Sequence, residues 1–406
     1  MENLSNRIEG IRKWLKSNDL DALIIPHDDE YLSEYIPPEN ERLAWVSGFT
    51  GSAGIAIITN DIAAIFVDGR YTVQVKQQVD EHIFKILHLI NNPFLKWIKD
   101  NLPPGVRLGL DSRLHRVNWM KMANKSFEKH AELIMIQHNP IDLLWDNRPQ
   151  GSTDKAILLD EKYTGKSSEF KRQELGKMIA KNKSDAAFLT QLDSIAWILN
   201  IRGNDVPCNP VLLCHGMLHS DGSFDLFINE NKLPQGFHKH VGPNVNVIPP
   251  DQIDNSLTKL SDKTIQLDAN KSNIWSRELI INAGANITYK DDPCTLPKAC
   301  KNPVEIACAE NAHLHAASGL VRSFAILDQR LSNSIPASEA WFSDLLYQEY
   351  AREEGFAELL PSAEAIVLDE AHQIPDVASK FFGSSLSSHQ LRDLCRDTLA
   401  ARDEEA

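Results

Sequence analysis

Apolar residues recur along the first part of the chain with two alternating periods, one typical of helices and one typical of strands. A helix over residues 4–20 is predicted by apolar side chains that share one face: Leu4, Ile8, Ile11 and Leu15. An apolar run at 21–25 then predicts a strand. Beyond residue 70 the same alternation predicts helices at 71–79, 94–102 and 118–130, and strands at 84–89, 107–111 and 132–136. We therefore expect an α/β domain that ends near Pro149.

The stretch from Glu41 to Tyr71 predicts a compact β unit. Three glycines are spaced for tight turns and close backbone approach: Gly48, Gly51 and Gly54. Two apolar runs rich in β-branched residues, 55–58 and 62–67, flank a polar break of hairpin length. The Asp-Gly-Arg-Tyr sequence at 68–71 then turns the chain and places a guanidinium and a phenol beside the end of the sheet.

The pattern of the first domain repeats further along the chain. A helical pattern at 170–183 precedes an apolar run at 185–189, and Trp197 follows that run as Trp45 follows the run at 21–25. A period of about 150–165 residues indicates a duplicated domain and not a solenoid. This second domain is expected to end near Cys300.

From Asn302 onward the pattern becomes helical. Pro303 suits the first turn of a helix. An apolar face follows, made of Ile306, Ala309, Ala312, His313, Ala316, Leu320 and Phe324. A second helix is predicted at about 337–352.

Composition and charge narrow the classes of function. The net charge of −14 and the lack of a basic cluster argue against nucleic acid as a partner. No apolar run approaches the roughly 20 residues that cross a bilayer, and the start of the chain lacks the apolar centre of a secretory signal. The six cysteines show no paired metal spacing, which is typical of reduced structural thiols in a cytoplasmic protein.

Several segments of the chain together resemble Xaa-Pro aminopeptidases, especially the long form with three domains. They are SEYIPPENERLAWVSGFTGSAG from Ser33, the DGRY turn, LLWDNRPQ from Leu143, YTGKSSEFK from Tyr163, LDSIAWILNIRGNDVPCNPV from Leu192 and KNPVEIACAENAH from Lys301. The resemblance implies two creatinase-like α/β domains, at 1–150 and 151–300. It also implies that 301–353 is the helical start of a pita-bread metallopeptidase domain, which is truncated in this chain.

The resemblance implies a particular chemistry, and the sequence departs from it. In that family two manganese ions are held by two Asp, one His and two Glu, and a metal-bound hydroxide attacks the bond before proline. No segment of this chain matches the ligand motifs, so no metal ligand and no catalytic residue is assigned, and we expect the chain to bind no manganese. Arg70 is assigned to substrate binding, since the DGRY arginine of related enzymes contributes to peptide binding. The alternative is that Arg70 is held by a carboxylate of its own turn. Tyr71 is expected to pack.

Other polar clusters favour structural roles. The segment 219–225, with His219, Asp221 and Asp225, resembles a ligand set, but its Asp-Gly is typical of a hairpin turn. His238 and His240 would share one face of a strand, where exposed polar residues are the better interpretation than a metal site. The remaining pairs are His313 with His315, which point apart on a helix, and Asp193 with Arg202, which are predicted to form a buried ion pair.

After Arg352 the resemblance to the peptidase ends. Residues 354–406 resemble a fragment of a DEAH-box helicase of the damage-inducible, XPD-like kind, and Asp369 and Glu370 would be a Walker B remnant. ATP binding also needs a glycine-rich phosphate loop. The nearest string, at 160–167, has Asp160 where the first glycine belongs. We interpret the tail as the product of a fusion or a broken reading frame.

The sequence therefore predicts two creatinase-like α/β domains, the start of a pita-bread domain and a foreign tail. The function by descent is release of an N-terminal residue that precedes proline, with peptides as substrates, and this chain is expected to be inactive alone. The alternatives are a non-catalytic dimerisation or peptide-binding module and an ATP-dependent helicase fragment. A cytoplasmic homodimer, with no membrane or nucleic-acid partner, is the expected state.

Overall fold

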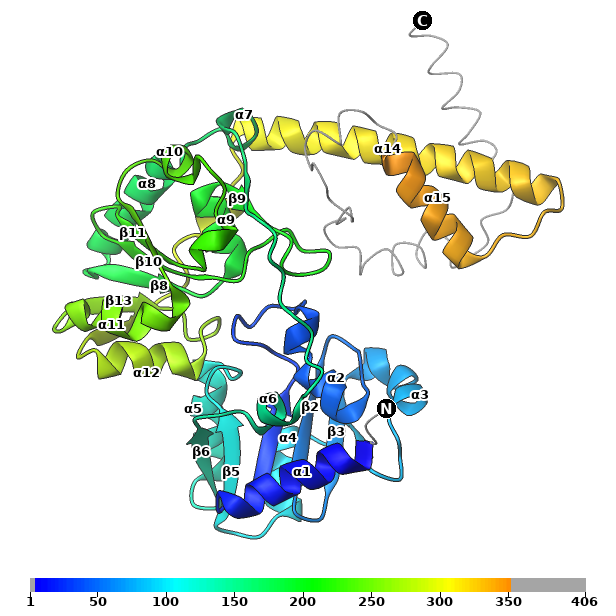
Figure 1. Cartoon of the computed structure of the whole chain (residues 1–406), viewed down its shortest axis with the longest axis vertical. Coiled ribbons are helices and arrows are strands. Elements are labelled where there is room, and N and C mark those ends of the chain that lie inside the picture. The colour runs from blue at the N-terminus through cyan, green and yellow to red at the C-terminus, as the bar shows by residue number, and fades with distance from the viewer. Residues whose placement is uncertain (1–3, 352–406) are drawn as a thin grey trace, which may run out of the picture. The chain divides into compact units, whose positions relative to one another are not determined.

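The computed structural model describes residues 4–351 of the chain. It divides into two compact units, Met1–Cys300 and Lys301–Ala406. The first unit contains two α/β domains in sequence, and the described part of the second unit is a pair of helices (Figure 1). The predicted helicase-like residues, Asp369 and Glu370 among them, lie outside the described residues.

The first domain is built on a six-stranded mixed sheet. The strands are β1 (Ala22–Pro26), β2 (Gly54–Thr59), β3 (Ala63–Val67), β4 (Lys85–His88), β5 (Val106–Asp111) and β6 (Ala131–Ile136). Their order is β4-β3-β2-β1-β5-β6. The hairpin of β2 and β3 is antiparallel, and β1 lies antiparallel to β2 and parallel to β5. The predicted strands and the predicted hairpin are confirmed.

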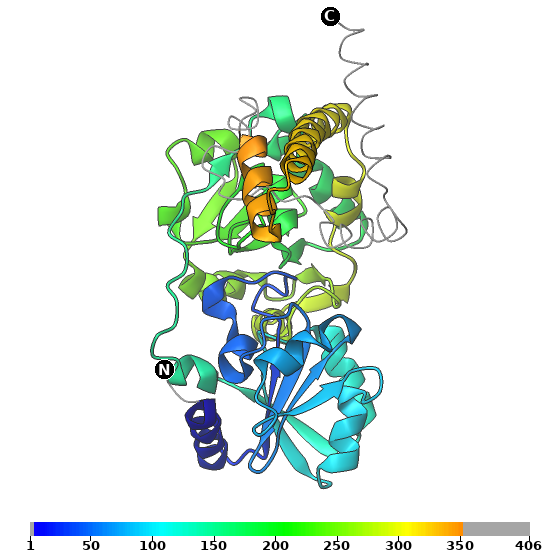
Figure 2. The same ribbon diagram turned by 90° about the vertical axis from the view of Figure 1, so that its right-hand side faces the viewer.

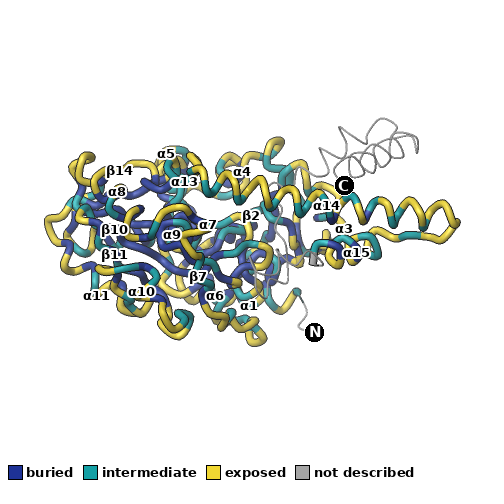
Figure 3. The backbone as a smooth tube through the Cα atoms, turned by 90° about the horizontal axis from the view of Figure 1, so that it is seen from above, coloured by how far each residue is buried: buried dark blue, intermediate teal, exposed yellow. Residues whose placement is uncertain are grey.

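Helices cover both faces of this sheet, which explains why its central strands are buried on both sides (Figure 3). The helices are α1 (Leu4–Ser17), α2 (Arg42–Ser47), α3 (Gln74–Gln78), α4 (Phe94–Asn101), α5 (Val117–Phe127) and α6 (Pro140–Leu144), with short 3-10 turns η1 (Pro38–Asn40) and η2 (Gly69–Tyr71). Successive residues of β1 point to opposite faces. Leu23 and Ile25 join a core with α1 and α2, whereas Ala22 and Ile24 join a core with α4 and α5.

Residues 42–47 form a helix, so the prediction of an all-β unit over 41–71 is wrong for its first part. The reason lies in the end of α2. Gly48 adopts a left-handed conformation (φ 82°), and its amide donates to the carbonyl oxygen of Ala44 at 2.7 Å. A glycine in this conformation is a common helix terminator, because it has no Cβ to clash. The sequence signal for a turn at Gly48 was correct, but the element before it was not identified.

The second domain repeats the arrangement of the first. Its strands are β8 (Ala186–Leu189), β10 (His215–His219), β11 (Phe224–Phe227), β12 (Val245–Ile248), β13 (Thr264–Leu267) and β14 (Asn286–Tyr289), and a small ladder joins β7 (Ile157–Leu158) to β9 (Ile201–Arg202). The order β12-β11-β10-β8-β13-β14 is that of the first sheet, strand for strand. The antiparallel and parallel pairs also match. This is the architecture that a domain duplication produces.

The second sheet is likewise covered on both faces by helices. They are α7 (Glu161–Thr164), α8 (Ser168–Lys181), α9 (Leu192–Leu199), α10 (Phe237–Val241), α11 (Ile253–Leu257), α12 (Ile274–Asn282) and α13 (Thr295–Ala299), with 3-10 turns η3 (Glu230–Lys232), η4 (Pro250–Gln252) and η5 (Thr258–Leu260). His238 and His240 lie on α10, so the prediction that they share a strand is wrong. Phe237 and Val241 of this helix are buried in the core, with helical spacing.

The two α/β domains of the first unit are joined by hydrogen bonds across a junction (Figure 2). Backbone amides donate to backbone carbonyls across it in the pairs Val117–Ser272, Asn118–Ala269, Ile274–His115 and Trp275–Ser112. Asn273, which caps α12, also donates from Nδ2 to the carbonyl oxygens of Glu30 and Arg113, at 2.8 and 2.9 Å. These bonds fix the second domain against loops of the first.

The described part of the second unit consists of α14 (Pro303–Ser332) and α15 (Glu339–Ala351), as predicted. Asn302 and Glu305 form a capping box at the start of α14, and Pro303 occupies its first turn. Several large apolar side chains of this pair are exposed, including Leu314 at 71% and Leu331 at 56%. None of the described helices is long and apolar enough to cross a membrane.

Candidate functional site

The Asp68–Tyr71 turn, where the sequence places its one substrate-binding residue, begins where β3 ends. Asp68 caps the η2 turn, and its Oδ1 accepts a hydrogen bond from the amide of Arg70 at 2.9 Å. The Arg70 side chain folds back on the same carboxylate, with Nη2 and Nε 2.8 and 3.1 Å from Oδ2. The turn therefore holds its own guanidinium in a fixed direction.

The Arg70 guanidinium is 58% exposed, so it is both anchored and accessible. Its hydrogen bonds hold the pKa of Asp68 below the usual value, and the same contact raises the pKa of Arg70. Nη1 of Arg70 makes no hydrogen bond to any described residue. The structure thus has the geometry of the alternative interpretation, an arginine held by its own turn, with a free donor edge toward solvent.

Tyr71 packs against the glycine-rich turn before β2. Its ring meets Phe49 edge to face at 5.4 Å, and its hydroxyl lies 2.7 Å from the Ser52 hydroxyl. Gly51 lies under both rings: a Cβ there would come within 2.3 Å of Phe49 and 2.8 Å of Tyr71. The close backbone approach predicted for this glycine is confirmed, and Tyr71 has the packing role that was expected.

The cluster at 219–225 is a hairpin. It joins β10 to β11, with Gly222 at a positive φ of 83°. His219 Nε2 lies 2.9 Å from Asp225 Oδ2, and Asn246 donates to Asp225 Oδ1 at 2.7 Å. Burial would raise the pKa of Asp225, but these hydrogen bonds outweigh it and lower the pKa. Within residues 4–351 no group of three or more His, Cys, Asp or Glu side chains is placed to hold a metal ion.

The remaining predicted polar pairs take other partners. His240 Nε2 lies 2.9 Å from the Asn200 carbonyl oxygen, and His313 Nδ1 lies 2.7 Å from the Ala309 carbonyl oxygen. Asp193 forms its ion pair with Lys298, whereas Arg202 donates to the carbonyl oxygens of Ala196 and Ile201. The predicted pair of Asp193 with Arg202 is therefore wrong: the lysine of α13 reaches this carboxylate from a segment far along the chain.

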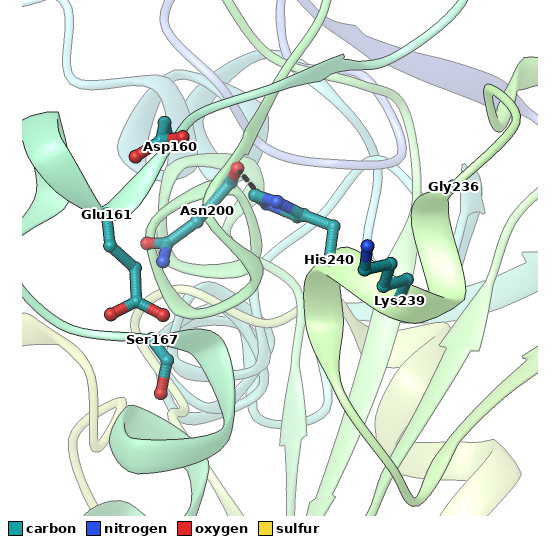
Figure 4. Close-up of a pocket in the computed structure, with 7 residues that line it drawn as sticks. All are labelled: Asp160, Glu161, Ser167, Asn200, Gly236, Lys239 and His240. Atoms are coloured by element: carbon teal, nitrogen blue, oxygen red, sulfur yellow. Dashed lines mark hydrogen bonds between the residues drawn. The ribbon is translucent and has the colours of Figure 1, made fainter.

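A polar pocket of about 430 Å³ opens on the second domain (Figure 4). It is lined by Asp160, Glu161, Ser167, Asn200, Gly236, Lys239 and His240. Asp160 caps α7 and Ser167 caps α8, so both side chains already serve backbone amides. A phosphate loop leads from a strand directly into a helix. Here the short helix α7 lies between β7 and α8.

Sequence reasoning missed the buried polar residues at the junction of the two domains. Asp29 and Tyr31 lie on the loop after β1 in the first domain, and His215 begins β10 in the second. Tyr31 stacks on His215 with ring centroids 4.9 Å apart. No local pattern marks Tyr31 and His215 as partners, because they are more than 180 positions apart in the sequence.

Both α/β domains match known family models. Residues 7–142 match the Creatinase/Prolidase N-terminal domain, and residues 147–305 match a second model with the same description. The duplicated sheets described above coincide with these two matches. The chain therefore belongs to the family of proteins with Creatinase/Prolidase N-terminal domains, and it carries two of them in tandem.

Within that family the chain is similar to Xaa-Pro aminopeptidases. It is 32% identical over 343 residues to a probable Xaa-Pro aminopeptidase P of Pyrenophora teres f. teres, across 81% of this chain and 52% of the relative. It is also 32% identical over 347 residues to one of Neurospora crassa, across 82% of this chain and 50% of the relative. The chain thus spans about half the length of these relatives.

A solved structure shares the fold. It is the X-prolyl aminopeptidase from Caenorhabditis elegans, described as a cytosolic enzyme with a di-nuclear active site. The TM-score is 0.81, with 87% of this chain and 60% of that chain covered, at 23% sequence identity. The predicted α/β fold with tandem creatinase-like domains is confirmed.

Proposed function

We propose that this chain forms the N-terminal, peptide-facing part of an Xaa-Pro aminopeptidase and that it does not hydrolyse peptides alone. The proposal rests on one combination of observations. The chain has two tandem creatinase-like domains, and residues 4–351 contain no group of side chains placed to hold a metal ion. The matched residues make up about half of each relative, and the activity in their names belongs to those longer proteins.

The described residues do not fit a pair of metal ions. A catalytic pair of divalent cations needs several carboxylate and imidazole donors around one point. The closest imidazole–carboxylate contact discussed above, between His219 and Asp225, is completed by the amide of Asn246, which is not a metal ligand in that arrangement. We therefore derive no catalytic step through a metal in this part of the chain.

The test is an assay of the full chain on an Xaa-Pro peptide with added manganese. We expect no release of the N-terminal residue above the rate without protein. The Neurospora crassa relative, assayed in the same buffer, is the positive control. Turnover by this chain at a rate comparable to that of the control would contradict the proposal.

Arg70 is proposed to bind peptide through its free Nη1 edge. Asp68 fixes the side chain in advance, so less side-chain entropy is lost when a carbonyl or carboxylate group binds. Arg70→Ala should weaken the binding of a proline-containing peptide by about tenfold, since a charged hydrogen bond contributes about 1.5 kcal/mol or more. Titration calorimetry measures the effect, with Lys125→Ala, which removes an exposed cation, as a control. Unchanged affinity would leave Arg70 with only its structural role.

A second candidate function is a dimerisation module, which the exposed apolar side chains of α14 and α15 favour. A homodimer at micromolar concentration in sedimentation equilibrium would support it, and a monomer would exclude it. For its location we propose the cytosol, as described for the Caenorhabditis elegans enzyme. The helicase alternative concerns residues outside the described part and stays a prediction.

A further inference from the structure

The loop after β1 inserts an aromatic side chain from the first domain into the second. Tyr31 packs against the core cluster of the second domain that contains Cys214 and Leu212. Its ring stacks on His215 with an interplanar angle of 27°. The preceding residue, Glu30, accepts a hydrogen bond on its carbonyl oxygen from Asn273 of the second domain. The loop is therefore part of the contact between the two domains.

Asp29 shapes the loop that carries Tyr31. Its carboxyl group is 1% exposed, and it accepts hydrogen bonds from the Tyr31 amide at 2.9 Å and from Asn40 Nδ2 at 3.1 Å. Both donors are neutral. Arg42 is the cation that acts on Asp29, but it already pairs with Glu30 and Asp142, at 2.8 and 2.7 Å. Asp29 thus has no ion-pair partner among the described residues.

His215 stacks on the Tyr31 ring and is also shielded from solvent. It is 8% exposed and lies among the rings of Tyr31, Phe188 and Trp275. Its Nε2 makes no hydrogen bond to any described residue. Arg113 acts on it with a charge of the same sign as a protonated imidazole. A protonated His215 would therefore be a buried cation with no counter-ion.

We propose that Asp29, which holds the backbone of Tyr31, and His215, which stacks on its ring, form a neutral acid–base latch, and that docking of the domains requires a proton on the carboxyl and none on the imidazole. Ionisation of either group places an uncompensated charge in the junction, and exposure to water relieves that charge. The loop that holds Tyr31 must then leave the second domain.

The pKa values of Asp29 and His215 are shifted in opposite directions, as the latch requires. Burial, helped by the neighbouring charge of Glu30 and opposed by the hydrogen bonds from Asn40 and the Tyr31 amide and by Arg42, raises the pKa of Asp29 to about 7. Burial, helped by Arg113, lowers the pKa of His215 to about 3. Two further titratable groups act on Tyr31 across the junction, the carboxylate of Asp205 and the thiol of Cys214.

The sign of each linkage follows from these values. For Asp29 the docked form is favoured below the undocked pKa of about 4, and this advantage is lost as pH rises toward 7. For His215 the docked form is favoured above the undocked pKa of about 6.5, and this advantage is lost as pH falls toward 3. Between pH 5 and 6.5, docking adds a proton to Asp29 and removes a proton from His215. The pH dependences of docking that come from the two groups therefore nearly cancel in the natural chain.

Two variants of the full chain separate the two effects. Asp29→Asn keeps the size and polarity of the side chain but cannot ionise. His215→Phe keeps the ring stack and removes the titrating nitrogen. His115, which packs against Trp119 and the Asp111 carbonyl oxygen, is present in the natural chain and in both variants, so its contribution cancels when each variant is compared with the natural chain. The exposed residues Asp61 and His82 supply the matched controls Asp61→Asn and His82→Phe.

Hydrogen exchange of the amides that bond across the junction, Val117, Asn118, Ile274 and Trp275, measures the opening. Rates are corrected for intrinsic exchange at each pH. From pH 5 to 6.5 we expect the opening constant of Asp29→Asn to fall by roughly tenfold and that of His215→Phe to rise by roughly tenfold. The natural chain and both control variants should change by less than about threefold.

Two results would overturn the latch. One is an opening constant that depends on pH in both variants as it does in the natural chain, or that changes with pH in the same direction in both variants. The other comes from the natural chain itself and does not depend on folding of a variant. The ring protons of His215 should not titrate by NMR above about pH 4, and titration near 6.5 in the folded chain would exclude the proposal.

Discussion

Gly51 shows how the size of one side chain fixes the turn before β2. The rings of Phe49 and Tyr71 close over its Cα, and the hydroxyl of Tyr71 then reaches Ser52. The same turn leads on to the hairpin that ends at Arg70. A residue with a Cβ at position 51 would have to move an aromatic ring out of a packed site.

Gly51→Ala should therefore destabilise the chain, by about 1–3 kcal/mol, because overpacking of a filled site costs energy of this size. Urea unfolding followed by tryptophan fluorescence measures the change. Gly69→Ala is the matched control, since a Cβ there would meet only His88 Nε2 at 3.7 Å, an ordinary contact. Equal stability of the two variants would contradict the steric argument.

Arg70 illustrates what a residue type can and cannot predict. The sequence placed a guanidinium at the end of the sheet, and the structure has it there. Its pairing with Asp68 follows from the η2 turn, which places the two residues side by side, and is the alternative that the sequence analysis gives. Whether the free edge of the guanidinium binds peptide is a question of binding that a contact within the turn does not answer.

At the scale of elements, every strand and most helices of the first domain were predicted from periodicity, because each has a local apolar pattern, whereas most elements of the second domain were not. The helix at Arg42–Ser47 was missed. It has only six residues, which is too short for a helical period to emerge. Its buried Arg42 also looks like a surface residue in the sequence. Its ion pairs with Glu30 and Asp142 compensate for the loss of hydration of this buried charge.

The α10 helix, which is part of the candidate site, was also not predicted from the sequence. His238 and His240 alternate like strand residues when only the polar positions are considered. Phe237 and Val241 are the buried positions, and their spacing of four is helical. The left-handed Gly236 and Gly242 at its two ends confine the helix to five residues.

At the scale of the whole molecule, the two α/β domains form one compact unit with its own cores. Four buried clusters lie within residues 8–294 of this unit, and the junction joins the domains by backbone hydrogen bonds. Val117 of the first domain belongs to a core cluster of the second, together with Phe188 and Leu267. The tandem domains therefore share part of their packing.

Residues 1–300, produced without the rest of the chain, should fold as a single cooperative unit. We expect a melting temperature within about 5 °C of the corresponding transition in the full chain, because a change of 1 kcal/mol shifts a large domain by only a few degrees. Differential scanning calorimetry measures it. Two separate transitions, or no transition, would show that the domains do not fold as one unit.

The sequence alone determined the strands of the first domain, the duplication and the family, because these depend on local apolar spacing and on segments that are each contiguous in the chain. It also placed Arg70 in its turn. Only the tertiary structure decided the partners of several polar side chains, since Asp193 meets Lys298 and Tyr31 meets His215 across more than a hundred residues. Whether a buried carboxyl or imidazole keeps its proton depends on which neighbours surround it in space, and a linear sequence does not specify those neighbours.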